Sequence, residues 1–194
     1  MPDPQPPSDT ERGELAVLAA ETASGVRAYL EASTTVASGT TPDVALPVVL
    51  LALSQVQVVG ARLGAIVDVV PSERFEPDAG PDPDVDPLRT ALANVFDGLD
   101  EYVEAIDPVL SGAVVHGSLS GDLAAVAADL AHGLRHFEAG RVDEALWWWQ
   151  FSYLSSWGAR AASALRVVLS ILAHLRLDVD SDLVADAEFD ALHP

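Results

Sequence analysis

The sequence predicts an all-α protein, a bundle of about five helices followed by a short C-terminal helix. Apolar residues recur at three- and four-residue intervals through long stretches of the chain, which is the periodicity of helices with one buried face. No alternating apolar run bounded by turn residues indicates a strand. The connections between the later helices are short, as in antiparallel bundles. With 49% hydrophobic residues in 194, the chain can build a core.

The chain begins with a Pro-rich segment, residues 1–8, that we expect to be a disordered leader. The first helix is predicted over about residues 9–33. Ser8 stands three residues before Glu11, which is the spacing of a capping box at a helix N-terminus.

The second helix is predicted to begin near Pro42 or Pro47 and to end near Val67. Proline is tolerated in the first turn of a helix because its missing N–H would have no partner there. Residues 71–87 hold five prolines and many acids, which predicts a loop.

The third and fourth helices are predicted from their end signals. Asp86 and the proline after it form an N-cap and first helical position, and the apolar pattern extends to residue 106. Ser118 is the expected N-cap of the fourth helix, and Gly140 its C-terminal stop. The apolar face of the fourth helix is expected to comprise Leu123, Val126, Leu130, Leu134 and Phe137.

The fifth helix is predicted over about residues 143–175, and a short helix over about 181–192. The latter lies in an acidic tail, residues 178–194. Residues 9–177 are therefore interpreted as one helical domain between a leader and a tail.

The charge excludes several classes of function. The net charge is −20, all ten basic residues are Arg, and the chain has neither Lys nor Cys. Such a chain is expected to repel nucleic acid and anionic membranes. It cannot form a lysine Schiff base or a thiolate nucleophile, and no cofactor is expected.

The location is predicted to be cytoplasmic. The N-terminus lacks the basic and apolar segments of a signal peptide. The longest uncharged run, Val44 to Ala61, contains Pro47 and three polar residues, so it is interpreted as a buried helix and no membrane span is predicted.

The fifth helix carries all four tryptophans of the chain within eleven residues. At about 100° per residue, one face is predicted to hold Trp147, Phe151, Leu154, Gly158, Leu165, Leu169 and Leu172. A second stripe on roughly the opposite side holds Trp149, Tyr153, Val167 and Ile171. A helix that is apolar on two faces is either central in its bundle or half-exposed at an interface. The candidate interface residues are Trp148, Trp149, Tyr153, Trp157, Val167 and Ile171.

Two polar rows raise the alternative of a metal site. The predicted third helix carries acids at three- and four-residue steps: Asp97, Asp100, Glu101, Glu104 and Asp107. Carboxylates from two helices can hold divalent metals in a bundle, but the Glu-x-x-His pair of such sites is missing. The fourth helix places Asp129, His132 and His136 on one side. We expect both rows to be solvated faces, and no metal ligand is assigned.

The second half of the chain carries a recognisable series of motifs: Tyr102-x-Glu104-x-Ile106-Asp107-Pro108, Gly117-Ser118-Leu119-x-x-Asp122-Leu123, Trp147-x-Trp149-x-Phe151-Ser152-Tyr153 and Trp157-Gly158. This series resembles the bacterial family catalogued as domain of unknown function 5063, over the C-terminal third to half of the chain. The resemblance implies an α-helical fold and no assigned function.

This chain departs from the family pattern at polar positions. Gly121 stands where Asp is usual, Trp148 where Glu is, Gln150 where Arg is, and Ser156 where His is. These replacements indicate packing or association rather than a polar site. The pattern positions that stay polar are the first candidates for a site: Tyr102, Glu104, Asp107 and Asp122.

The preferred hypothesis is therefore a non-enzymatic helical protein that acts by association with another protein or with a second copy. The alternative is a metal-dependent hydrolase that uses carboxylates of the third and fourth helices.

Overall fold

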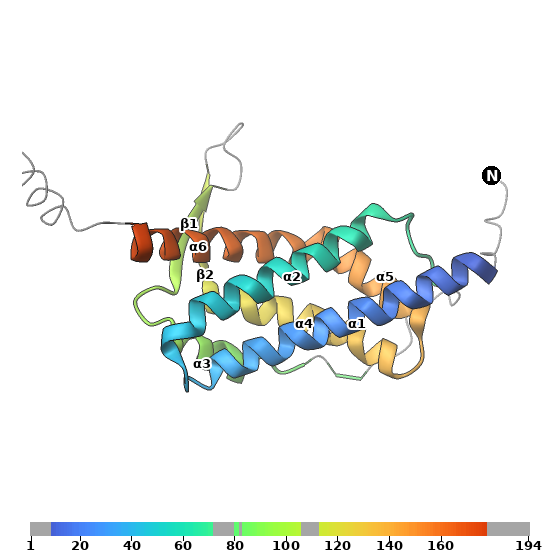
Figure 1. The fold of residues 1–194 in the computed structure, drawn as a ribbon, viewed down its shortest axis with the longest axis horizontal. Helices are drawn as coiled ribbons and strands as arrows, with labels where there is room; N and C mark the ends of the chain where they lie inside the picture. Colours follow the sequence, from blue (N-terminus) through green and yellow to red (C-terminus); the bar gives the residue numbers. More distant parts are fainter. Residues whose placement is uncertain (1–8, 72–79, 82, 106–112, 178–194) are drawn as a thin grey trace, which may run out of the picture.

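The computed structural model describes residues 9–71, 80–81, 83–105 and 113–177 (Figure 1). These residues form a helical bundle with one small β-hairpin, so the predicted all-α class is confirmed. The elements in chain order are α1 (Asp9–Ala37), η1 (Pro42–Val44), α2 (Ala45–Ala65), α3 (Asp86–Val95), β1 (Glu101–Ala105), β2 (Val114–Ser118), α4 (Leu119–Glu138), α5 (Val142–Ser152), η2 (Tyr153–Trp157) and α6 (Gly158–Leu177).

Helix α4 lies at the centre of the bundle. It packs against α1, α3, α5 and α6, while α2 packs against α1 and α6. Figure 1 shows α1 and α2 side by side in front of α4. The Tyr29 hydroxyl of α1 donates to the Leu123 carbonyl of α4 at 3.0 Å, which satisfies a fully buried hydroxyl.

The predicted ends of α4 are correct, and the predicted start of α3 is wrong by one residue. The Ser118 side chain accepts a hydrogen bond from Gly121 N at 3.0 Å, as expected of an N-cap. Gly140, after α4, has the positive φ of a C-terminal stop. Asp86 is the first residue of α3 and not its cap; its N–H donates to Asp84 Oδ1 at 3.1 Å. The predicted leader and final helix lie outside the described residues.

The predicted third helix is wrong beyond residue 95. Helix α3 ends at Val95, a turn follows in which Gly98 has a φ of 77°, and the chain then enters β1. Strand β1 pairs with β2 in antiparallel register, with Tyr102 opposite Gly117 and Val103 opposite His116. The hairpin projects beyond the helices at one end of the bundle (Figure 1). The expectation that no strand would occur is therefore corrected.

The predicted fifth helix is interrupted by a π-helical turn, η2. The Gly158 N–H bonds to the Tyr153 carbonyl, five residues earlier, where an α-helix would use the fourth. A Cβ at position 158 would overlap that carbonyl oxygen, so the turn needs glycine there.

The π-turn shifts the buried face of the helix by one residue. The buried series steps by three or four except from Ser152 to Trp157, where it steps by five: Ala145, Trp149, Ser152, Trp157, Ala161, Ala164, Val168 and Leu172. The two helices α5 and α6 can therefore both face the core.

Two helical stretches, Pro42–Ala65 and Val142–Leu177, are long and apolar enough to cross a bilayer by length and composition. One third of the most apolar window of each stretch is buried inside the bundle. The buried positions of α2 recur at the spacing of a core-facing helix and include Val49, Leu53, Val56 and Leu63.

Candidate functional site

Three of the four predicted polar-site residues converge at the base of the hairpin. The Tyr102 hydroxyl of β1 donates a short hydrogen bond to Asp122 Oδ2 in the first turn of α4. Arg160 of α6 donates to the other oxygen, Asp122 Oδ1, at 3.3 Å. Asp122 is thus held from two sides by segments far apart in the sequence. The fourth candidate, Asp107, lies outside the described residues.

Glu104 forms the second half of this polar cluster. Its carboxylate accepts from the Ser163 hydroxyl at 2.7 Å and lies 3.4 Å from Arg166 Nη2. Arg160, Ser163 and Arg166 follow one another at three-residue steps, so they share one face of α6. Tyr102 and Glu104 are two residues apart in β1, so their side chains point to the same side of the hairpin. The hairpin is therefore fastened to α4 and α6.

Gly117 gives Tyr102 the room to reach Asp122. The two residues are direct partners in the hairpin, and a Cβ on Gly117 would stand 2.5 Å from Tyr102 Cζ. The aromatic ring thus covers the opposite glycine.

Burial sets the protonation behaviour of the cluster. It raises the pKa of Asp122, and hydrogen bonds from Tyr102 and Arg160 offset part of this effect. The pKa of Tyr102 also lies above its usual range, first because of burial and then because of the hydrogen bond to Asp122. A tyrosine with a raised pKa keeps its proton near neutral pH, so Tyr102 acts as a hydrogen-bond donor.

Asp100 occupies the N-terminus of α4. Its carboxylate accepts from Ser120 N at 2.7 Å and from Ser120 Oγ at 2.8 Å, and its carbonyl accepts from Leu119 N at 2.8 Å. A helix N-terminus attracts anions through its unpaired N–H groups and its dipole. Here the protein supplies the anion itself.

An open hollow of about 370 Å³ lies beside the cluster, lined by residues of α3, β2, α4 and α6. Its cationic groups are already paired: Arg89 with Asp86 at 3.0 Å and Arg160 with Asp122. Paired charges leave little net attraction for a small charged ligand.

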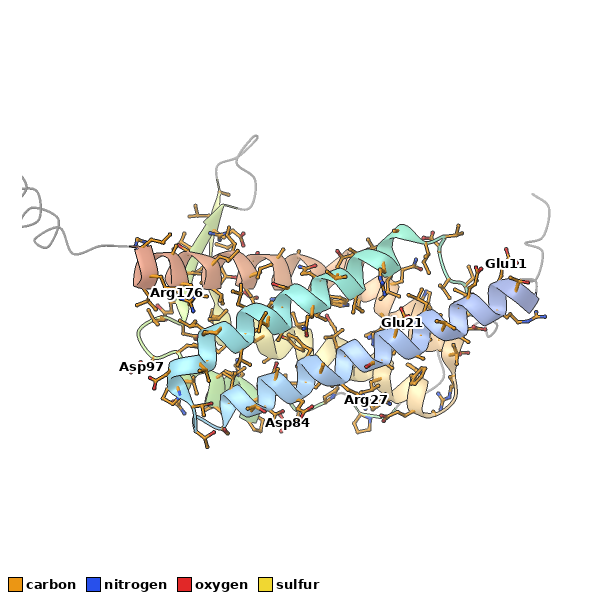
Figure 2. All side chains as sticks on the ribbon, viewed as in Figure 1. Glu11, Glu21, Arg27, Asp84, Asp97 and Arg176 are labelled. Carbon is orange, nitrogen blue, oxygen red and sulfur yellow. The ribbon has the colours of Figure 1, made fainter. Side chains whose placement is uncertain are left out.

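The predicted acidic row does not form one face. Asp97 lies in an exposed turn (Figure 2), Asp100 caps α4, and Glu104 pairs with α6. Within the described residues, no three His, Cys, Asp or Glu side chains gather as metal ligands would. The geometry of this part of the chain therefore gives the hydrolase alternative no support.

The predicted row on α4, Asp129, His132 and His136, does not face solvent as expected. His136 is fully buried, and the His132 ring lies 4.1 Å from the Trp148 ring, because α5 folds back over this side of α4. Asp129 accepts from Ser156 Oγ at 2.9 Å, and its carbonyl accepts from Trp148 Nε1 at 2.9 Å. Burial raises the pKa of Asp129, which the bond from Ser156 partly offsets. Trp148 and Ser156, which both depart from the family pattern, therefore both donate hydrogen bonds to Asp129.

The predicted interface residues are mostly covered within the chain. Trp149, Trp157 and Val167 are buried, which corrects the expectation that their stripe is open to a partner. Trp148, Tyr153 and Ile171 are half-buried.

The opposite side of the same helix is exposed. The Trp147 and Phe151 rings stack with centroids 5.5 Å apart, and Leu154 follows one turn later. Phe151 is 52% exposed and Leu154 65% exposed, and Trp147 is half-buried. We call Trp147, Phe151 and Leu154 the aromatic stripe. Sequence periodicity placed these three residues on one face, but it wrongly continued that face to Gly158 and Leu172, which are buried.

The fold and the polar cluster define a class of protein: a helical bundle whose central helix anchors a β-hairpin through charged and hydrogen-bonded side chains. The family described as domain of unknown function (DUF5063) matches residues 14–174. The chain belongs to this family, and the match extends well beyond the motifs from which the resemblance was predicted.

Among solved structures, the chain is similar to the crystal structure of protein BF1032 from Bacteroides fragilis. The two share 17% identity and align with a TM-score of 0.59 over 84% of this chain and 92% of the other. This likeness supports the fold alone. No curated protein matches the chain.

Proposed function

We propose that this protein is a non-catalytic binding module that recognises another protein through the aromatic stripe. The observation that carries the proposal is the exposure of a stacked Trp147–Phe151 pair and of Leu154. Large side chains of this kind dominate the energy of protein interfaces. Leaving them in water forfeits the free energy that their burial would release.

The polar cluster favours binding over catalysis. Both oxygens of Asp122 accept from protein donors, and Glu104 and Asp129 are each held by a serine hydroxyl. A general base or a metal ligand needs an open lone pair directed at a substrate or an ion. These carboxylates instead fasten the hairpin and η2 to the bundle.

The experiment is photo-crosslinking in cells that naturally produce the protein. A photoreactive phenylalanine analogue replaces Phe151, and the matched control carries it at Val103, which is 53% exposed on the hairpin at the other end of the bundle. We expect a discrete crosslinked protein from position 151 and none from position 103. Equal crosslinking from both positions, or none from 151, would contradict the proposal.

A further inference from the structure

The chemistry of the partner follows from the surroundings of the aromatic stripe. Asp143 precedes Trp147 by four residues, so it extends the stripe at the N-terminal end of α5. Its carboxylate is exposed and has no hydrogen bond or ion pair within the described part of the chain. One end of the apolar stripe is therefore negative.

The segment after α2 adds apolar and acidic groups beside the stripe. Gln150 holds this segment: its Nε2 donates to the Leu63 carbonyl at 2.9 Å, and its Oε1 accepts from Val69 N at 2.8 Å. The anchored backbone presents Val67, which is 90% exposed, and the adjacent exposed Asp68. Asp68, like Asp143, has no partner among the residues that the structure describes.

The end of α2 brings this segment next to Leu154. A Cβ at Gly64 would stand 3.5 Å from Leu154 Cδ2, so the last turn of α2 touches the stripe. Exposed Val67 and Asp68 follow Gly64 by three and four residues, so an apolar and an acidic side chain come directly after this contact, while Asp143 extends the stripe at its other end.

We infer that the partner presents an amphipathic helix whose apolar face is flanked by Lys or Arg. The aromatic stripe extends over eight residues, from Trp147 in α5 to Leu154 in η2. This is about 10 Å along the helix axis, which matches roughly two turns of a helix laid on it. The two acids offer ion pairs to basic flanks, and the net charge of −20 attracts a basic segment from a distance. The same net charge disfavours a second copy of this chain, because two proteins of charge −20 repel each other.

This inference rests on the proposed function and is tested with synthetic peptides. The probe is an amphipathic Leu/Lys helix of about 18 residues, five turns long. One control peptide has the same composition in an order without an apolar face, and a second is an amphipathic Leu/Glu helix. Binding is measured by isothermal titration at low and high salt.

We expect the Leu/Lys helix to bind at least tenfold more tightly than its scrambled isomer. The double variant Phe151→Ser/Leu154→Ser should abolish that preference, while Val103→Ser retains it. Asp68→Asn/Asp143→Asn should weaken binding several-fold and reduce its salt dependence. Equal binding of the two Leu/Lys peptides would reduce the effect to general charge attraction and overturn the inference, as would preferred binding of the Leu/Glu helix.

Two further measurements separate this inference from the proposed function. If crosslinking at position 151 yields another protein and the peptides show no preference, only the inference fails. If light scattering instead finds a dimer that Phe151→Ser dissociates, the occupant is a second copy, and the recognition of another protein is overturned together with the inference. If phosphatidylcholine vesicles bind through the stripe and the peptides do not, the surface is lipid-directed and the inference is overturned. If the peptides show no preference and crosslinking at position 151 is also absent, both ideas fail.

Discussion

The two sides of α5 carry the same kinds of residue and are placed in opposite environments. Trp149 is fully buried, and its Nε1 donates to the Leu130 carbonyl of α4 at 3.0 Å. Phe151, two residues later, is half-exposed and stacks on Trp147. Aromatic content alone therefore does not distinguish core from interface. Rotation around the helix places one side in the core and leaves the other exposed.

The largest expected effect tests the π-turn that keeps α5 and α6 on the same core. Deleting Ser155 within η2 should convert its five-residue step to four and preserve the buried series. Deleting Ala159 in α6 should rotate all later residues by about 100° and expose Ala161, Ala164 and Val168. We expect cooperative thermal unfolding by circular dichroism for the first variant and loss of it for the second. Similar behaviour of the two deletions would contradict this account of η2.

The next effect compares the two sides of α5 directly. Trp149→Ala should lower the free energy of unfolding by about 3–5 kcal/mol, because it opens a cavity and removes the indole hydrogen bond to the Leu130 carbonyl. Phe151→Ala, on the exposed side, should change it by less than about 0.5 kcal/mol. Urea denaturation measures both. Comparable losses would mean that the aromatic stripe is also covered by the chain.

The smallest effect concerns the polar cluster. Because burial raises the pKa of Asp122, the folded state binds more protons than the unfolded state above the ordinary Asp value of about 3.9. Stability should therefore fall as pH rises from that value through the folded pKa. Asp122→Asn removes this contribution and should flatten the melting temperature against pH. Asp97→Asn changes the net charge equally at an exposed turn and serves as control. Parallel profiles for the two variants would refute the role of burial at Asp122.

Local signals in the sequence predict much of the bundle. Ser118 and Gly140 mark the ends of α4 because capping depends on residues only a few positions apart. The hairpin was missed because Leu99, Val103 and Ile106 are spaced as in a helix. The register of β1 depends on pairing with residues about 15 positions away, which a local pattern does not contain. The π-turn was missed because uniform rotation was assumed, and Trp149, Tyr153 and Trp157 follow at the four-residue steps of an uninterrupted helix.

The candidate site was predictable only in part. The family resemblance identified Tyr102, Glu104 and Asp122, which the structure brings together. Their partners on α6 lie 38 residues from Asp122 and 59 from Glu104, so no local spacing indicated them. For the aromatic stripe, periodicity grouped Trp147, Phe151 and Leu154 but wrongly added Gly158 and Leu172, because the π-turn shifts the buried face. Which side of α5 packs against α4 depends on tertiary contacts that local spacing does not contain.

The division of α5 into a buried and an exposed side is tested most directly by fluorine NMR of protein labelled with 5-fluorotryptophan, assigned by single Trp→Phe variants. Exchange from H₂O to D₂O should shift the Trp147 signal and leave those of Trp149 and Trp157 unchanged. Adding the amphipathic Leu/Lys helix should then move Trp147 while the two buried signals stay in place. A solvent-dependent shift of the Trp149 or Trp157 signal would contradict this division. A Trp147 signal that changes with neither solvent nor peptide would also contradict it.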